Sequence, residues 1–389
     1  MANAPVYEID PKAFWADPYP DLARLRAEAS VAYVPQLGAT LITRRDDIFE
    51  NEKKTDVFSS DQPDGLMTQL MGQNMMRKDG EAHSAERKAI FPTISPRTVK
   101  DVWTAQFRDH TQKVLDGLAP KGAGDLVDDY AMLVSAEALK SMTGLTNMDA
   151  LEMNRVSQGM IDGCSNYAGD PEVEANCHDC TASIDRHIDE RIPELDANPD
   201  YSLLSVQRQA GLSDEATKAN IRLAISGGQN EPRDAIAGAA WALLTHPDQL
   251  QMILDGKATW MQAFEEYARW VSPIGMSPRR IAKQHELHGV TLEPETRAFF
   301  MFGSGNRDET VFDNPDSFDI TRDVGPAISF GAGPHFCAGA WASKALIAEV
   351  ALPMLFDRLK GLRLDPQAET TFGGWAFRGP LKVPVLWTT

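Results

Sequence analysis

The pattern of hydrophobic and polar positions predicts helices over most of this chain. Residues 11–26 open with turn residues and continue as a short amphipathic helix. Residues 115–212 have the pattern of several helices joined by acidic connections. Ser213, followed by two acidic residues, supplies a cap and first turn for a long helix that should end before Pro247.

Short segments between the helices predict a few strands. Residues 31–35 and 39–43, with Gly38 between them, are typical of a hairpin. Residues 278–282 and 290–292 also have strand character, and the segment from Phe372 to Pro380 is typical of a turn. We therefore predict a mainly α fold with small β-sheets.

The long helix that follows Ser213 should be interrupted in its middle. Gly227 and Gly228 weaken it, and Pro232 has no N–H to donate to the carbonyl of Gly228. We expect that carbonyl to be freed and the helix axis to bend. On this pattern alone, the bend is a simple kink.

Cys337 lies in a glycine-rich loop that leads into an apolar helix. The loop covers residues 329–339 and the helix covers residues 340–356. Gly331 and Gly333 allow the backbone to turn and to approach a flat ligand closely. The helix start offers free N–H groups and a positive dipole end beside the sulfur, which favours a thiolate. Spacing alone leaves a nucleophile, a structural thiol and a metal ligand open.

The loop resembles the haem-binding signature of the cytochrome P450 family. The residues that carry the resemblance are Phe330, Gly331, Gly333, His335, Cys337 and Gly339. The resemblance implies one haem domain over residues 1–389, with haem b between a long distal helix and the Cys loop with its proximal helix. It also implies that Cys337 is the axial ligand of the iron, as a thiolate, and that Phe330, Gly331 and His335 lie against the cofactor.

Three further basic residues resemble the family's contacts to the haem propionates. His83 and Arg87 stand at i and i+4, so one helix face carries both. In the family, the same His-x-x-x-Arg pattern binds a haem propionate. Arg280 matches the family position that pairs with a propionate, and Arg279 is the competing choice.

Glu266 and Arg269 form a Glu-x-x-Arg pair on one helix face. The pair precedes Arg307 in the same order as in the P450 family. The resemblance implies that Glu266, Arg269 and Arg307 form a buried polar network that supports the haem loop.

The interrupted helix departs from the family pattern. In the family an acid and a threonine follow the glycines; here Asn230 takes the place of the acid and Glu231 that of the threonine. We expect Glu231, whose pKa an apolar cavity would raise, to deliver protons, and Asn230 to hold the opened helix. The alternative is that Glu231 pairs with Arg233. A proline after the replaced threonine is similar to peroxide-using members, and the glutamate is similar to a subgroup acting on small aromatic ethers.

The substrate pocket is expected to include Phe377 at the tip of the C-terminal turn, Ile274, Met276 and Gly227. Bulky side chains there would suit a compact planar ligand better than a long flexible chain. We therefore rank small aromatic substrates, with O-demethylation or hydroxylation, above terpenes and fatty acids.

Charge and cysteine content limit which binding partners and which metal or redox sites we expect. The formal net charge is −18, which argues against nucleic acid and anionic membranes as partners. The N-terminal residues have neither a basic start nor an apolar run, so we expect a cytoplasmic protein without membrane insertion. Cys177 and Cys180 have the C-x-x-C spacing of redox or zinc sites, but no second ligand pair lies nearby, which favours an inert pair.

A basic segment stands out on this acidic chain. From Arg77 to Lys113 there are eight basic residues against five acidic ones, a local balance of +3. Such a segment could dock an acidic partner, and a solvated helix face is the alternative. No flavin-binding or iron–sulfur-binding segment is recognisable, so electrons should come from a separate ferredoxin-type donor with its reductase.

Taken with the resemblance, these features predict a haem-thiolate monooxygenase. The expected reaction inserts one oxygen atom from O2 into a small apolar organic substrate. A peroxide-driven peroxygenase and a non-catalytic haem protein that binds or senses a ligand remain the alternatives.

Overall fold

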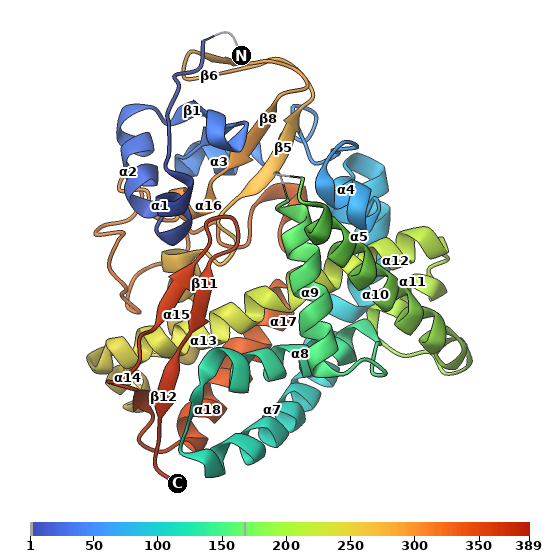
Figure 1. The fold of residues 1–389 in the computed structure, drawn as a ribbon, viewed down its shortest axis with the longest axis vertical. Coiled ribbons are helices and arrows are strands. Elements are labelled where there is room, and N and C mark those ends of the chain that lie inside the picture. Colours follow the sequence, from blue (N-terminus) through green and yellow to red (C-terminus); the bar gives the residue numbers. More distant parts are fainter. Residues whose placement is uncertain (1–2, 167–168) are drawn as a thin grey trace. The chain divides into compact units, whose positions relative to one another are not determined.

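The computed structural model describes residues 3–166 and 169–389, which fold into two compact units (Figure 1). The first unit combines the chain up to Asp61 with Ala237–Cys337 and Pro366–Val383. The second combines Gln62–Ile236, Ala338–Asp365 and Pro384–Thr389. The prediction of a single haem domain stays a prediction.

The first unit is built around a sheet. Its helices are α1 (Pro11–Ala16), α2 (Tyr19–Glu28), α3 (Arg45–Asn51), α14 (Pro247–Leu254), α15 (Trp260–Val271) and α16 (Phe302–Gly305). Its strands are β1 (Val31–Val34), β2 (Ala39–Ile42), β3 (Phe58–Ser59), β5 (Ser277–Ile281), β6 (His285–Leu287), β7 (Val290–Leu292), β8 (Arg297–Phe300), β10 (Thr371–Gly373) and β11 (Gly379–Lys382).

Five of these strands form one sheet in the order β1-β2-β8-β5-β3. The predicted hairpin is confirmed, because β1 and β2 pair antiparallel with Val31 opposite Ile42. β2 continues into the sheet through a parallel pairing with β8. Buried apolar side chains cover both faces, among them Leu41 and Phe299 in one cluster and Phe58 and Phe300 in another. The sheet thereby fixes β5, which carries Arg279 and Arg280.

The second unit is almost entirely helical. Its helices are α4 (Leu66–Met71), α5 (Gly80–Ile94), α6 (Pro96–Thr98), α7 (Thr104–Leu118), α8 (Met132–Thr143), α9 (Ala150–Cys164), α10 (Pro171–Ala197), α11 (Leu203–Gln209), α12 (Asp214–Gly228), α17 (Ala340–Lys344) and α18 (Leu352–Arg358). Its strands are β4 (Ala123–Asp125), β9 (Arg363–Leu364) and β12 (Pro384–Leu386), which form a sheet in the order β4-β12-β9. Helix α13 (Asn230–Thr245) begins in this unit and ends in the first.

The apolar helix predicted after the Cys loop is present and is continuous from Ala340 to Arg358. A π-helical stretch, Ala345–Ala351, joins α17 to α18. This stretch packs against α7, and α18 lies beside the same helix (Figure 1). The phenol of Tyr130, which is fully buried, donates to the carbonyl of Ala351 at 2.7 Å and fixes the stretch.

The fold class predicted from the sequence is confirmed. The described residues are mainly helical with small sheets, and Ser213 caps α12 by accepting from the N–H of Ala216. The helix predicted to end before Pro247 ends at Thr245. Among the described residues, no helix combines the length and apolar character needed to cross a membrane.

Candidate active site

The Cys loop is a closed turn in the first unit. The N–H of Cys337 donates to the carbonyl of Phe330 at 2.9 Å, and the N–H of Gly331 donates to the carbonyl of Ile328 at 2.9 Å. Gly331 and Gly333 have backbone φ angles of +72° and +62°, which residues other than glycine rarely adopt. The turn therefore presents the thiol at its end, directly before the helix that begins at Ala340.

An aromatic face accompanies this loop. The ring of Phe330 lies 6.3 Å from that of Phe264 on α15 and 6.4 Å from that of Phe336. His335 ends a short 3₁₀ turn and is half-buried, and Phe336 beside it is exposed. Phe330, Gly331 and His335 are therefore close to Cys337, as the sequence predicted, while their contact with a cofactor stays a prediction.

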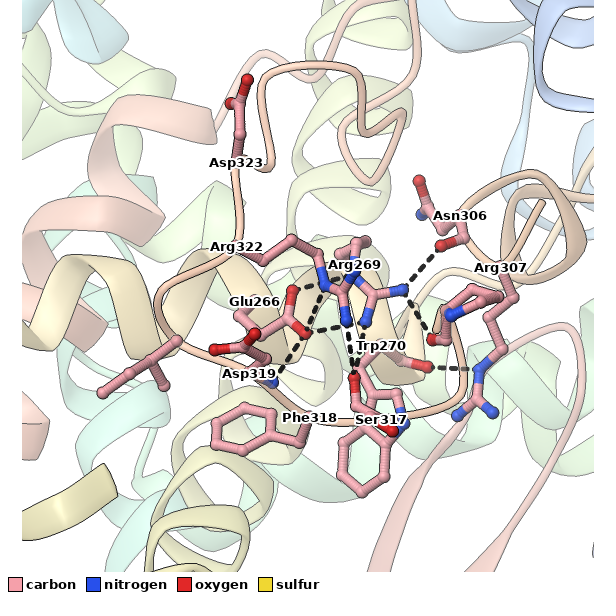
Figure 2. Close-up of polar contacts among 12 residues, drawn as sticks. Glu266, Arg269, Trp270, Asn306, Arg307, Ser317, Phe318, Asp319, Arg322 and Asp323 are labelled. Carbon is pink, nitrogen blue, oxygen red and sulfur yellow. Dashed lines mark hydrogen bonds and ion pairs between the residues drawn. The ribbon is translucent and has the colours of Figure 1, made fainter. Parts of the chain in front are cut away.

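The Glu266–Arg269 pair lies at the centre of a buried polar network (Figure 2). The Arg269 guanidinium donates to both Glu266 carboxylate oxygens at 2.7 Å, and both side chains are buried. Arg269 also donates to the carbonyl oxygens of Asn306, Pro315 and Ser317. One residue of α15 thereby holds three separate points of the segment that precedes the Cys loop.

Arg307 lies at the edge of this network, where it binds the residue after Arg269, and it does not reach Glu266. Arg322 donates to Glu266 at 3.2 Å, whereas Arg307 donates to the carbonyl of Trp270 and to Asp316 (Figure 2). Arg307 also lies 3.5 Å over the ring of Tyr19. The reason is geometric: the loop after Asp316 folds back across α15, so an arginine further along the chain reaches the carboxylate.

Asn306 connects the network to the Cys loop. Its side-chain oxygen accepts from the N–H of Ile328 at 2.8 Å, and its amide nitrogen donates to Ser329 at 3.2 Å. Its own carbonyl is held by Arg269. Sequence reasoning missed Asn306 and Arg322, although Asn306 stands directly before the arginine that it singled out.

The two candidate arginines of β5 point to opposite faces, as successive residues of a strand must. Arg279 is buried and donates to Glu52 at 3.1 Å. Arg280 is half-buried and donates to the carbonyl of Asp61 at 2.9 Å and to Glu295 at 2.7 Å. Arg280 therefore keeps a partly open face, which favours it over Arg279 as the propionate contact.

Glu52 is a further residue that sequence reasoning missed. Its side chain is buried, and its carboxylate accepts from the N–H of Ala332 in the Cys loop at 2.5 Å as well as from Arg279. Burial raises the pKa of this carboxyl, while Arg279 and the Ala332 N–H oppose that effect. In the sequence Glu52 follows an acidic helix and looks like a solvated residue.

The C-terminal turn predicted from the glycines is present as the β10–β11 hairpin, with Phe377 in its connection. Phe377 forms an antiparallel bridge with Ile274, and the N–H of Gly275 donates to the carbonyl of Ala376 at 2.8 Å. Ile274, Met276 and Phe377 are half-buried, and Met276 packs on an apolar core cluster of the first unit. The hairpin tip is thus fastened beside Ile274.

His83 and Arg87 lie on α5 in the second unit, where the predicted i, i+4 spacing is realised on one helix. His83 is buried and Arg87 is half-buried. Glu86, between them, accepts from Asn220 of α12 at 2.9 Å and pairs with Lys78. α5 is thereby fastened to α12.

The interrupted helix is broken at one residue, Gln229, between α12 and α13. The hydroxyl of Ser135 on α8 lies 3.4 Å from the carbonyl oxygen of Gly228 and donates to that of Gln229 at 2.7 Å. The Gly228 carbonyl therefore receives no N–H from Pro232, as the sequence predicted, and the Ser135 hydroxyl stands near it while giving its proton to the next carbonyl. A side chain added at Gly227 would meet no heavy atom of the described residues within 4 Å.

Glu231 lies in the first turn of α13, directly after the break. Its carboxyl oxygens are covered and have no hydrogen-bond partner among the described residues, although the residue as a whole is half-buried. Burial raises its pKa to about 8, with a smaller contribution from Asp234. Arg233 donates to Asp234 at 2.8 Å and to Asn154, so the Glu231–Arg233 pair considered from the sequence does not form.

Asn230 is buried, and its amide donates to Gln158 of α9 at a long distance of 3.5 Å. Its neighbour Gln229 donates to the carbonyl of Met132 at 3.2 Å. These amides fasten the break to α8 and α9, and the holding role of Asn230 stays a prediction.

Cys177 and Cys180 are buried on α10 and pack against α9, where Cys177 lies close to Gly163. Burial raises the pKa of Cys177 to about 11 and also raises that of Cys180. No cluster of metal-ligating side chains is found among residues 3–166 and 169–389. That Cys177 and Cys180 are an inert pair stays a prediction.

The residues around the Cys loop fit a flat, iron-containing cofactor. The loop turns through two positive-φ glycines and ends in a thiol directly before a helix start, which suits a metal ligand. In the second unit, Gly227 at the end of α12 is exposed.

Comparisons with known proteins agree with this geometry. A family model described as Cytochrome P450 matches residues 261–348, which include Glu266, Arg269 and the Cys loop. Pulcherriminic acid synthase of Bacillus subtilis is 25% identical, with 96% of this chain and 95% of that protein covered. Steroid C26-monooxygenase of Rhodococcus jostii is 26% identical, with 88% and 75% covered.

The solved structures agree on the fold. P450BioI, crystallised with hexadec-9Z-enoic acid ligated acyl carrier protein, superposes with a TM-score of 0.88 at 22% identity, covering 97% of this chain and 100% of that one. None of these three names a small aromatic substrate, so the aromatic-ether subgroup expected from Glu231 gains no support. The Cytochrome P450 family model thus matches the part of the chain that holds the Glu266–Arg269 pair and the Cys loop, and the solved structure shows that this chain has the P450 fold.

Proposed function

We propose that this protein is a haem-thiolate monooxygenase whose axial iron ligand is Cys337. The observation that carries the proposal is the closed turn from Phe330 to Cys337, fixed by a 2.9 Å hydrogen bond and ended by a thiol. Haem b, when bound, supplies reductive activation of O2 and transfer of one oxygen atom to the substrate, while the other oxygen leaves as water.

The chain's own residues hold the cofactor and exclude competing reactions. His83, Arg87 and Arg280 are the candidates for the haem propionates, because each is a donor on a fixed helix or strand. Phe330 and His335, which stand in the same loop as Cys337, would contact the cofactor. The network of Glu266, Arg269 and Arg322 keeps the loop in place through Asn306.

Glu231 supplies protons for the oxygen that leaves as water. Its pKa of about 8 leaves the carboxyl mostly protonated at neutral pH, so the Oε1 or Oε2 hydrogen can be donated. Neither oxygen has a hydrogen-bond partner among the described residues, and a proton held there is not committed to another group. Asn230 cannot titrate and holds the opened helix.

Electrons come from a separate ferredoxin-type donor. On α5–α7 of the second unit the exposed basic side chains are Lys88, Arg97, Lys100, Arg108 and Lys113, which we call the basic face. Arg77 is buried and Lys78 pairs with Glu86, so these two do not belong to it. Arg108 also donates to the carbonyl of Glu349, in the π-helical stretch that follows the Cys loop. An acidic donor would be attracted to this surface.

The substrate is a small apolar organic molecule. Support comes from Phe377 and Ile274, which the hairpin holds side by side with little freedom to separate. Fixed aromatic and branched side chains suit a compact planar ligand. The names of the relatives give no small aromatic substrate, so the aromatic class rests on these side chains alone.

A peroxygenase is the second candidate, and the unpartnered carboxyl of Glu231 favours it. Hydrogen peroxide already carries the two electrons and two protons that O2 would have to receive, and an acid beside the cofactor would move a proton from one peroxide oxygen to the other so that water leaves.

The monooxygenase and the peroxygenase are separated by measuring product formation in two mixtures. One contains ferredoxin, its reductase and O2, and the other contains hydrogen peroxide alone. The proposal expects the reductase-driven rate to exceed the peroxide-driven rate. A faster reaction with peroxide supports the second candidate, and no product with either oxidant contradicts both.

A further inference from the structure

Glu52 joins the Cys loop to β5 within the first unit. It follows α3 directly, and its residue is only 2% exposed. Its Oε2 accepts from the N–H of Ala332 at 2.5 Å, and its Oε1 accepts from Arg279 Nη2 at 3.1 Å. Both oxygens are thus engaged by donors, as a carboxylate requires.

The loop lies closely against Glu52. A Cβ on Gly331 would stand 3.4 Å from Glu52 Oε2, and a Cβ on Gly333 would stand 3.0 Å from the Glu52 carbonyl oxygen. Ala332, whose N–H Glu52 accepts, lies between these glycines and inside the turn that the Cys337–Phe330 hydrogen bond closes. A movement of Glu52 therefore moves the turn that carries the thiol.

Arg279 holds the carboxylate in place and balances its charge. Its side chain is buried and donates also to Ser277 Oγ at 2.5 Å and to the carbonyl of Pro278 at 2.8 Å. The guanidinium stands 5.4 Å from the centroid of the Phe300 ring. Removing one partner of such a pair leaves a buried charge without compensation, which is costly.

We propose that Glu52, held by Arg279, is a positioning residue for the Cys337 thiolate and thereby for the reduction potential of the bound haem. The proposal rests on the proposed role of Cys337 as axial ligand. Glu52 fixes the Ala332 amide in the middle of the turn, and the neutral Glu52–Arg279 pair keeps a net charge away from the thiolate. The residue does not touch the reacting atoms.

Glu52→Gln changes both effects without changing size. The amide has one acceptor and one donor, so a donor now faces either Ala332 or Arg279. The positive charge of Arg279 is left unbalanced and favours the reduced haem, which raises the reduction potential. Adding Arg279→Met removes that charge and the competing donor, and the oxygen of the introduced amide can again accept from Ala332.

The double variant separates positioning from general destabilisation. A residue that only stabilised the fold would leave the double variant more damaged than Glu52→Gln. The proposal expects the opposite, namely a return toward the wild-type potential. Asp308→Asn is the matched control, because Asp308 is also buried, accepts from the backbone N–H of Arg45 and pairs with Arg44 at 2.7 Å, while its carboxylate accepts from no described residue of the Cys loop.

The experiment is a spectroelectrochemical titration of the haem-loaded variants, with the carbon monoxide spectrum of each reduced protein. Glu52→Gln should raise the reduction potential. It should also lower the ratio of protein with the red-shifted carbon monoxide band to protein without it by about tenfold or more, because a hydrogen bond to a charged group contributes that much. The double variant should recover, and Asp308→Asn should keep the wild-type potential. An unchanged potential in Glu52→Gln, or a double variant further from wild type, overturns the proposal.

A second pair of variants covers the case in which Glu52→Gln does not fold. Both are double variants without a charge at positions 52 and 279: one combines Glu52→Gln with Arg279→Met, and the other combines Glu52→Leu with Arg279→Met. Only the first has an oxygen that can accept a hydrogen bond from the N–H of Ala332. The proposal expects the red-shifted band to be weaker in the second, and equal bands overturn it. A wild-type protein that lacks the red-shifted band overturns the axial role of Cys337 itself, which distinguishes the two failures.

Discussion

The buried carboxyl of Glu231 should make the stability of this protein depend on pH, and Glu231→Gln should remove that dependence. Glutamine keeps the size of the side chain but cannot ionise. Burial raises the pKa of Glu231 from the ordinary 4.5 to about 8, so the folded protein binds this proton more tightly than the unfolded chain does. The comparison therefore reports directly on the environment proposed for the proton donor.

The sign and size of this pH dependence follow from the linkage between proton binding and folding. Below pH 4.5 both states carry the proton and the contribution of Glu231 to stability is complete. As the pH rises toward about 8 the unfolded chain ionises first, so wild type loses about 1.4 kcal/mol per pH unit. The whole loss amounts to about 5 kcal/mol, and it ends above pH 8, where both states are ionised.

The assay is urea unfolding of the haem-loaded protein between about pH 5 and about pH 9, for wild type and Glu231→Gln. The unfolding free energy of the variant minus that of wild type should increase across this range and become constant at its upper end. Glu215→Gln is the matched control: the same chemical change on α12, at an exposed side chain whose surroundings change little on unfolding.

A difference that stays constant from about pH 5 to about pH 9 would show that Glu231 ionises alike in both states. The carboxyl would then not be held neutral in the folded protein, and the proton-donor role would lose its physical basis. A difference that also appears with Glu215→Gln would point to a general effect of charge.

Three other predictions concern the site and its partners. Glu231→Gln should keep substrate binding but lower the product formed per reducing equivalent and raise peroxide release; full coupling would mean that protons arrive by another route. Lys88→Glu or Lys113→Glu should slow reduction by an acidic ferredoxin, more at low than at high salt, whereas equal effects at both would exclude docking on the basic face. Arg322→Gln should lower the midpoint of thermal unfolding and the haem content more than Arg307→Gln, because Arg322 pairs with the buried Glu266 beside Arg269, whereas Arg307 pairs with the exposed carboxylate of Asp316; equal losses would mean that Arg307 supports the loop as well.

The sequence was informative where chemistry and backbone geometry depend on neighbouring residues. The turn around Cys337 needs glycines at fixed offsets, and the helix break needs Pro232 one turn after Gly228. Both are local features, and both are found in the structure. The Glu266–Arg269 pair is local in the same sense, since i and i+3 meet on any helix.

The sequence was uninformative where a side chain meets a distant partner. Arg322 and Arg307 are both loop arginines, and only the path of the loop decides which one reaches Glu266. Glu52 follows an acidic helix and meets Ala332 280 residues later in the chain. The burial of Glu52 depends on tertiary packing, which the periodicity of hydrophobic residues does not predict.

The central claim is that Cys337 ligates the haem iron as a thiolate. It is tested most directly by the carbon monoxide spectrum of the reduced protein, measured for wild type and for Cys337→Ala, with Cys180→Ala as a control on a buried cysteine of the second unit. The red-shifted band should be present in wild type and in the control and absent from Cys337→Ala. A red-shifted band of unchanged position and intensity in Cys337→Ala would contradict the claim.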